Sequence, residues 1–547
     1  MKNRKFIAVF AVLAMLFAYA SAGAAEEAAA FNLNVSIASE PATIDPALNS
    51  AVDGAVMLSH LFEGLVKLVE AGDGGSAWAP GAAESWDVTD VEDGGTVWTF
   101  HLRKDVLWSD GKPLTAHDFV YAWQRLANPE TTADYSYMLD TVKGWYDIQD
   151  GADPSTLGVK AVDDYTFEVS LITSVPYFLD VAGFPSCFPV RQDAIEAGGD
   201  QWTFDPATYL TNGPYKLAEW VHSEKIILAK NENHYDYANL GPDTITFTLM
   251  DDNNARLNAY DSGELDYIED VPVDLIPTFI AEGKITIVPY IGTYYVEFQT
   301  QLEPFTDPNV RKAFNLAIDR NYIVENITRT GQVPATGFVP SGIYDVEGGA
   351  GADFRTVGGE YYSVTDESYE SNCEEARALL AEAGYPGGEG FPTVVYLYNT
   401  SDAHKSIGEA LQYMWQEELG VNVQLQNEEW NTFLETRKQG NYSIARGGWI
   451  ADYNDPATFL DMFVTGGGNN DPQYSNPDYD ALIVEIKSES DLAVRFEKLH
   501  QAEDIIIKDD MIVGPIYFYT NYYMQREDLG GIYRNTMGIT IFSYAHK

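Results

Sequence analysis

Opposite charges stand six residues apart in the stretch Thr436–Pro456, which reads TRKQGNYSIARGGWIADYNDP. Arg446 precedes two glycines and a tryptophan, and Asp452 follows them. Six residues of extended chain span about 20 Å, the length of a short peptide rather than of an internal ion pair. The guanidinium can bind a carboxylate and the carboxylate can bind an ammonium, both through charge-assisted hydrogen bonds. The spacing is therefore that of a site for the two ends of an extended zwitterion.

The two glycines between these charges, Gly447 and Gly448, leave the backbone without side chains. Another extended chain can approach such a segment closely and form main-chain hydrogen bonds with it, as in strand addition. The alternative is a buried strand that leads into a loop with ordinary surface charges. The residues of this stretch alone leave both interpretations open.

The elements around this stretch must position its charged side chains. After Gly440, residues 442–445 alternate as a short strand, so the sequence places both charges at the strand's exit. The preceding residues predict strand, helix, strand and helix, in that order, at 394–398, 402–418, 421–425 and 430–438. The first three of these elements form a βαβ unit.

Strands alternate with helices in the rest of the chain as well. Thr115 and Asp118 form a capping box that opens a helix to Leu126, and Ser371 with Glu374 predicts a second helix start. Further strands are predicted at 32–37, 61–69, 97–102, 166–171, 225–230 and 244–249. This alternation predicts the α/β class.

Seven motifs, taken together, connect the chain to a known family. They are IDPALNS (44–50), LFEGL (61–65), VWTFHLR (97–103), WSDGKPLTAHDFVYAWQRL (108–126), TNGPYKL (211–217), LYNTSDAHK (397–405) and RGGWIADYNDP (446–456). In this order and at this spacing, they resemble the oligopeptide-binding proteins of ABC importers, which form family 5 of the extracytoplasmic solute-binding proteins.

The resemblance implies the two-lobed fold of periplasmic binding proteins, of type II and of the large peptide/nickel-binding class. It also implies an extra α/β domain on the first lobe. By this likeness, residues 23–66, 191–291 and 520–547 form lobe 1, residues 67–190 form the extra domain, and residues 292–519 form lobe 2.

The resemblance also implies a role for individual residues. Asp452, in the motif ADYN, matches the aspartate that receives the amino terminus of the peptide. Arg446, Arg437 and His404 match positions that meet its carboxylate, directly or through water. Two segments match those that pair with the peptide main chain, Ser50-Ala51-Val52 and Gly448-Trp449-Ile450. Tyr121, Tyr295, Trp430 and Trp449 match positions that line the ligand tunnel.

Each of these residues also has an ordinary structural explanation. An aspartate before Tyr453-Asn454-Asp455-Pro456 is suited to capping a turn. Arg437 is explained by a solvated helix surface, and His404 by a helix start after Ser401. Aromatic side chains most often belong to the core, and this chain has 35 Tyr and 11 Trp.

Composition excludes some partners. The chain has 33 Lys and Arg against 83 Asp and Glu, a formal net charge of −50. Such a charge argues against nucleic acids and anionic membranes as partners. The partners implied by the resemblance are short peptides and the membrane permease of an ABC importer, with the protein itself a monomer and no cofactor.

The first residues predict export. Lys2, Arg4 and Lys5 precede an apolar run, and Ala20-Ser21-Ala22 supplies small residues for cleavage, which is typical of a signal peptide over residues 1–22. The first cysteine is Cys187, so no cysteine near the cleavage site can carry a lipid. We therefore expect an unlipidated periplasmic protein in which Cys187 and Cys373 are free thiols.

An enzyme would need reactive groups in a recognisable pattern. The sequence contains no HExxH, GxSxG or GxxxxGK[ST] motif, and neither cysteine belongs to a CxxC pair. We therefore expect a binding protein. Two alternatives stay open: a protein of the same fold for a dipeptide, a metal chelate or a sugar, and a secreted hydrolase whose two carboxylates cannot be recognised among the 83.

Overall fold

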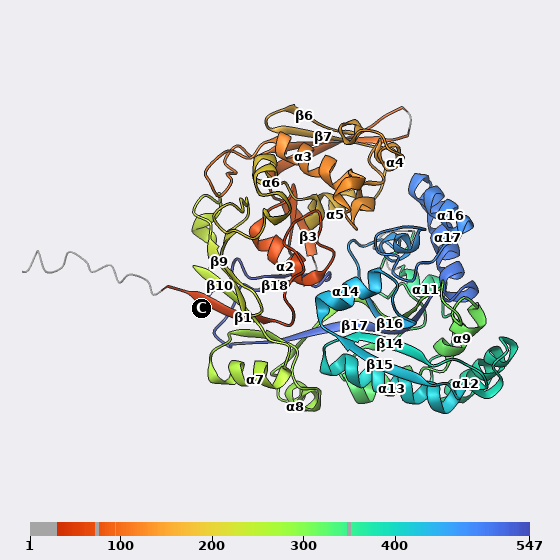
Figure 1. Cartoon of the computed structure of the whole chain (residues 1–547). Helices are drawn as coiled ribbons and strands as arrows, with labels where there is room; N and C mark the ends of the chain where they lie inside the picture. Colours follow the sequence, from red (N-terminus) through yellow and green to blue (C-terminus); the bar gives the residue numbers. More distant parts are fainter. Residues whose placement is uncertain (1–29, 72–75, 93, 347–351) are drawn as a thin grey trace, which may run out of the picture.

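The computed structural model describes residues 30–71, 76–92, 94–346 and 352–547 (Figure 1). The predicted signal peptide lies outside these ranges. Within them, no helix combines the length and the apolar character that a membrane span requires. Cys187 and Cys373 are both buried free thiols, as predicted.

One mixed sheet runs through most of the molecule and has eleven strands in the described residues. Its longest strands, β12 and β17, have 13 residues each and lie side by side in its middle. The order across the sheet is β15 (Val423–Glu428), β14 (Val394–Asn399), β16 (Ile444–Ile450), β12 (Thr286–Phe298), β17 (Val513–Gln525), β11 (Tyr267–Glu269), β1 (Asn32–Ile37), β10 (Thr244–Leu249), β9 (Lys225–Lys230) and β8 (Tyr215–Val221), with β13 (Val333–Pro334) also paired to β17.

β12 and β17 connect the two halves of this sheet, one with β15, β14 and β16 and the other with β11, β1, β10, β9 and β8. Their first ladder pairs residues 286–289 with 520–523, close to β11, and their second pairs residues 293–297 with 513–518, next to β16. The register shifts between Pro289 and Thr293. Such an irregularity increases the local twist and bends the strands. The sheet therefore bends where its two halves meet.

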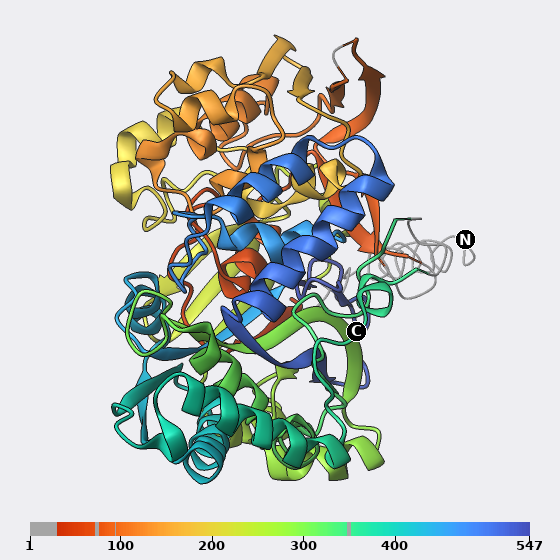
Figure 2. The same cartoon turned by 90° about the vertical axis from the view of Figure 1, so that its right-hand side faces the viewer.

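Helices cover both faces of the sheet (Figures 1 and 2). The longer ones are α2 (Val52–Leu61), α7 (Asn253–Ser262), α9 (Pro308–Leu316), α12 (Asp366–Glu382), α13 (Asp402–Leu419), α14 (Trp430–Lys438), α16 (Pro477–Ser488) and α17 (Leu492–Glu503). α14 and the strands β1, β7, β9 and β10 have the predicted bounds. The predicted strand at 61–69 is wrong in its first part, because α2 extends to Leu61 and β2 begins at Val66.

The two predicted capping boxes have different outcomes. Thr115 and Asp118 form one at the start of α3 (Ala116–Ala127), as predicted. The box predicted at Ser371 is wrong, because α12 already begins at Asp366 and Ser371 lies inside it, where its hydroxyl donates to the Ser368 carbonyl at 2.7 Å. Asp366 and Glu367 occupy the first turn of α12, where carboxylates complement the helix dipole.

A second sheet forms a unit of its own, drawn in orange at one end of the molecule in Figures 1 and 2. It is antiparallel, in the order β4 (Ala83–Asp90), β5 (Thr96–Leu102), β7 (Thr166–Leu171) and β6 (Val159–Asp163). α3 packs on it through Phe119 and Trp123, whose rings lie 5.6 Å and 5.3 Å from that of Phe167. We call residues 83–190 the orange unit.

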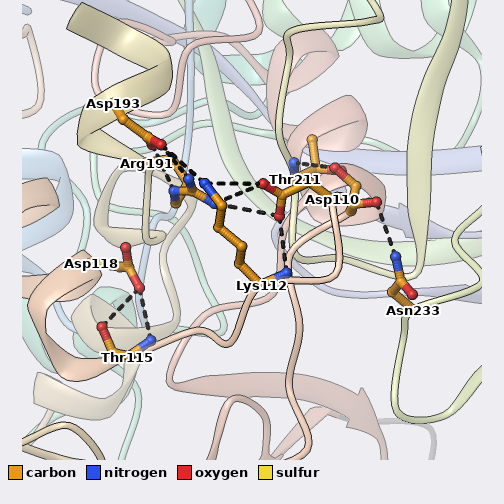
Figure 3. A network of polar contacts seen from close by, with 9 residues as sticks. Asp110, Lys112, Thr115, Asp118, Arg191, Asp193, Thr211 and Asn233 are labelled. Atoms are coloured by element: carbon orange, nitrogen blue, oxygen red, sulfur yellow. Dashed lines mark hydrogen bonds and ion pairs between the residues drawn. The ribbon is translucent and has the colours of Figure 1, made fainter.

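The motif at 108–126 attaches the orange unit to the rest of the chain (Figure 3). Arg191 binds Asp110 at 3.3 Å and Asp193, and its guanidinium lies over the Trp108 ring. Ser109 exchanges hydrogen bonds with Thr211. The longest of the seven motifs therefore has a structural function, because it holds the orange unit on the rest of the chain.

A buried ion cluster joins the orange unit to α16, which crosses the middle of Figure 2 in blue. The Lys487 ammonium contacts Asp140 of the orange unit and lies 2.8 Å from Asp461. All three residues are buried. Burial raises the pKa of Asp140 to about 6, although the lysine opposes this shift. The cluster therefore depends on its single cation.

We expect Lys487→Ala to lower the free energy of unfolding by about 3 kcal/mol at pH 8, since it leaves two buried carboxylates uncompensated. The loss should shrink at pH 5, where Asp140 can be protonated. Denaturant titration measures both values. Lys216→Ala is the matched control, because its pair with Glu232 is exposed and should contribute less than about 1 kcal/mol. Equal losses in the two variants would contradict the assignment.

Candidate functional site

A cavity of about 750 Å³ lies between the two halves of the central sheet. One wall includes the start of α2, and the opposite wall includes α14 and the end of β16. The orange unit contributes Asp134, Tyr135 and residues around Phe184. This volume is in the range of sites that enclose small organic ligands.

β16 presents an unpaired edge to this cavity. It is antiparallel to β12 from Ile444 to Ile450, but it pairs with β14 only at Ile444 and Ala445. From Arg446 onward, its second edge has no strand partner among the described residues, and residues 446 and 448–452 line the cavity. Main-chain groups on such an edge can bind an added strand. The strand is longer than predicted, so the glycines lie within it rather than after its exit.

The two glycines of β16 have different functions. A Cβ on Gly447 would lie 2.2 Å from the ring of Tyr295, the residue opposite it on β12, so glycine is required there for packing. Gly448 lines the cavity, where a Cβ would lie 2.6 Å from the Tyr519 hydroxyl. Only the second glycine therefore opens the backbone toward the cavity.

Asp452 is a buried carboxylate at one end of this edge, 6% exposed. It accepts hydrogen bonds from the Tyr135 hydroxyl at 3.2 Å and the Thr458 hydroxyl at 3.3 Å. No cation pairs with it among the described residues. Burial raises its pKa to about 8, while the two hydroxyls oppose the shift. A ligand ammonium would supply the missing charge.

Arg446 is the corresponding unpaired cation, at the other end of the free edge. Its guanidinium lies 5.5 Å from the ring centre of Tyr294 and 5.9 Å from that of Trp430. Its Nε atom is buried without a hydrogen-bond partner, and no carboxylate of the described residues pairs with it. Aromatic faces stabilise a guanidinium but leave its hydrogen-bond donors available for a carboxylate.

Arg437 and His404 also line the cavity, but neither offers a free positive charge. Arg437 pairs with Asp471 at 2.8 Å and with Glu297 at 3.4 Å. Burial, together with the nearby Arg446, lowers the pKa of His404 well below its usual value, so its ring is neutral. Of the three residues expected to meet the ligand carboxylate, Arg446 alone therefore offers an unpaired charge among the described residues, and contact of the carboxylate with Arg437 or His404 stays a prediction. His404 retains a polar role, with Nδ1 3.2 Å from the Tyr294 hydroxyl.

The other predicted site residues mostly lie together. The cavity is lined by Ser50, Ala51, Val52, Tyr295, Trp430, Gly448, Trp449 and Ile450. Tyr121 is the exception and does not line it. This side chain lies on α3 and is half-buried. It packs against the hydrophobic core near Arg125 and Asp45.

Several cavity residues could not be identified from the sequence, among them Tyr135, Asp53 and Asp180. Tyr135 donates to Asp452 from a position 317 residues earlier in the chain. None of the three belongs to one of the seven motifs. Their proximity to the site arises from the packing of the orange unit and α2 against β16, so no local pattern in the sequence indicates it.

Comparison with known proteins agrees with this geometry. The family described as "Bacterial extracellular solute-binding proteins, family 5 Middle" matches residues 77–471. The chain belongs to this family. It is 40% identical to the periplasmic oligopeptide-binding protein OppA of Salmonella typhimurium over 499 residues, which cover 90% of this chain and 88% of the relative.

Solved structures of family members confirm the two-lobed α/β fold. Haemophilus influenzae OppA, in complex with the peptide RPPGFSPFR, superposes with a TM-score of 0.86 at 33% identity, covering 95% of this chain and 99% of the other. The periplasmic murein tripeptide-binding protein MppA, in its unliganded open form, gives only 0.62 at 32% identity, covering 95% and 98%. Since the identities are nearly equal, the lobes of this structure are arranged as in the peptide complex.

We expect Asp452→Asn to stabilise the ligand-free protein in the closed arrangement of its lobes. The native carboxyl keeps its proton up to about pH 8, whereas the unfolded chain loses it near pH 4. The native state therefore binds more protons over this range, and the free energy of unfolding of the original protein falls as pH rises through it. Asparagine removes this dependence, which should make the variant more stable by on the order of 3 kcal/mol at pH 8.

Denaturation at pH 4 and pH 8 measures this difference, which should vanish at pH 4 because both side chains are then neutral. Asp147→Asn changes an exposed aspartate and serves as the control, with no gain at either pH. A variant that is less stable than the original protein at pH 8 would show that Asp452 is ionised and compensated in the free protein.

Proposed function

We propose that this chain captures short peptides in extended form between its two lobes and delivers them to the permease of an ABC importer. The observation that carries the proposal is the pair of unpaired charges, Asp452 and Arg446, at the two ends of the free edge of β16. A peptide main chain matches this arrangement, because it is a strand with an ammonium at one end and a carboxylate at the other.

Main-chain pairing explains how one cleft can accept many sequences. Hydrogen bonds to backbone groups do not depend on the side chains of the ligand, which point alternately to either face of the added strand. In this proposal the ligand pairs with residues 448–450 on one lobe and 50–52 on the other. Ligand contacts with both lobes favour the closed arrangement. The protein acts as a monomer, without a cofactor and without changing the peptide.

Its organisation follows from the same proposal. Lobe 1 comprises residues 23–66, 191–291 and 520–547, residues 67–190 form the extra domain, and residues 292–519 form lobe 2. β12 and β17 would be the hinge strands, since β12 crosses the boundary between residues 291 and 292 and β17 crosses the boundary between residues 519 and 520. Residues 1–22 are removed on export to the periplasm, which leaves an unlipidated protein.

Other ligands fit the charges less well. A sugar carries neither an ammonium nor a carboxylate, so it would leave both Asp452 and Arg446 without a partner in a closed cleft. A metal chelate would compensate at most one of them. A dipeptide carries both charges but is much shorter than the free edge of β16. If the protein were a hydrolase, peptides incubated with it would be cleaved, which mass spectrometry detects.

A cycle of two proteins and two peptides tests the amino-terminal contact. We expect Asp452→Ala to weaken the binding of a free peptide by roughly two to three orders of magnitude, because it leaves the peptide ammonium buried and unpaired. Acetylation of the peptide should weaken its binding to the original protein comparably and cause little further loss in the variant. Calorimetry measures the four affinities. Equal binding of free and acetylated peptides to the original protein would rule out this contact.

A second cycle tests the carboxyl-terminal contact. Arg437 is paired within the protein and His404 is neutral, so neither offers a free positive charge in place of Arg446. We therefore expect Arg446→Ala to weaken the binding of a peptide with a free carboxyl terminus by about tenfold to a hundredfold. Amidation of that terminus should produce the same loss in the original protein and almost none in the variant. A full additional loss on amidation in the variant would assign the carboxylate to another residue.

A further inference from the structure

The described cavity wall has more unpaired carboxylates than unpaired cations. Several are neutralised by ion pairs within the protein, namely Glu63 with Lys67 (3.3 Å), Asp134 with Lys438 (2.5 Å), Asp270 with Arg256 (3.8 Å), Asp471 with Arg437 (2.8 Å) and Glu269 with Arg534. Four carboxylates of the described wall have no cationic partner, those of Asp53, Asp180, Glu435 and Asp452. Against them stands one unpaired guanidinium, that of Arg446. A peptide without charged side chains compensates only Asp452 and Arg446.

Asp180 is the most constrained of the remaining carboxylates. It lies on the short helix α5 (Phe178–Gly183) and accepts a hydrogen bond from the Trp78 indole at 3.2 Å. A Cβ on Gly183 would lie 2.3 Å from the Trp78 ring, so glycine is what allows the indole to lie against α5. Trp78, Asp180 and Gly183 all line the cavity. The protein thus fixes this carboxylate without giving it a cation.

The other two carboxylates have partial explanations. Glu435 is exposed and accepts a hydrogen bond from the Gln439 amide at 2.5 Å, so water compensates its charge. Asp53 lies in the first turn of α2, where it accepts a hydrogen bond from the Gly54 backbone at 2.8 Å. At this position the helix dipole favours a negative charge. Asp180 also lies in the first turn of a helix, the six-residue α5, and it is half-buried rather than exposed, so burial raises the pKa of its carboxyl to about 7.

The surroundings of Asp180 place it at the Asp452 end of the cavity. Phe184, which follows one turn after Asp180, has its ring centre 5.1 Å from that of Tyr135. The hydroxyl of Tyr135 in turn donates to Asp452. Asp180 therefore lies on the Asp452 side of the cavity, where the proposed function places the amino end of the ligand.

We propose that Asp180 is a specificity-determining residue that selects peptides with a lysine or arginine side chain near their amino end. This inference rests on the proposed function, since it requires the peptide ammonium to bind Asp452. The second cation of the ligand then lies beside Asp180, held by a charge-assisted hydrogen bond. The peptides for which this cleft is built are accordingly basic.

Matched peptides test the proposal. Norleucine has a linear side chain close in size to that of lysine but without the ammonium, so Ala-Lys-Ala-Ala is compared with Ala-norleucine-Ala-Ala by calorimetry. The same exchange is made at the first and at the last position of the peptide. We expect lysine at one of the first two positions to bind about tenfold to a hundredfold more tightly than norleucine, and lysine at the last position to give no advantage.

Two variants complete the design. Asp180→Asn keeps an acceptor for the Trp78 indole and should abolish the lysine advantage, while its affinity for the norleucine peptides shows that it is folded and active. Glu435→Gln removes a carboxylate from another part of the cavity lining, on α14, and should keep the advantage. Peptides that bind in an Asp452-dependent manner but without any preference for lysine, or a preference that survives in Asp180→Asn, would overturn this inference alone. Absence of binding by all peptides would overturn the proposed function.

Discussion

The structure depends on the free-energy cost of burying charged side chains away from water. Asp452 is buried and Arg446 is half-buried, and neither has an ionic partner within the part of the chain that the structure describes. Transfer of an unpaired charge away from water is costly. A folded protein normally avoids such groups by pairing them, as this one does for Arg437 and Lys487. Asp452 and Arg446 line the same cavity and have opposite signs. A ligand with complementary charges, as in the proposed function, would compensate the cost of their burial.

The same constraint explains why the cavity is made from distant parts of the chain. A single segment would either expose its charges or pair them locally. Here Asp452 is enclosed by Tyr135 of the orange unit, and Arg446 lies between Tyr294 and Trp430. The orange unit is in turn attached by Arg191 and the surrounding network (Figure 3). A motif remote from the cavity is thus required for the environment of Asp452.

Local chemistry made much of the fold predictable. The capping box at Thr115 and the helix at 430–438 were found because caps and hydrophobic periodicity act within a few residues. The prediction of a helix start at Ser371 was wrong because a serine followed three residues later by a glutamate also occurs inside a helix that starts earlier. Arg446 and Asp452 were identified from their spacing and motif. Their environment was not, because ion pairs such as Arg437–Asp471 and contacts such as Tyr135–Asp452 join residues 34 and 317 positions apart.

Closure and ligand binding are coupled through Asp452 if the protein binds peptides as proposed. With the lobes apart, this carboxylate would be hydrated and ionised at neutral pH. Closure buries it against Tyr135, so in the absence of a cation the carboxylate must take up a proton, which its pKa of about 8 reflects. A peptide ammonium makes that proton unnecessary and lowers the free energy of the closed arrangement. The residue that recognises the amino terminus thus also disfavours closure around an unsuitable ligand.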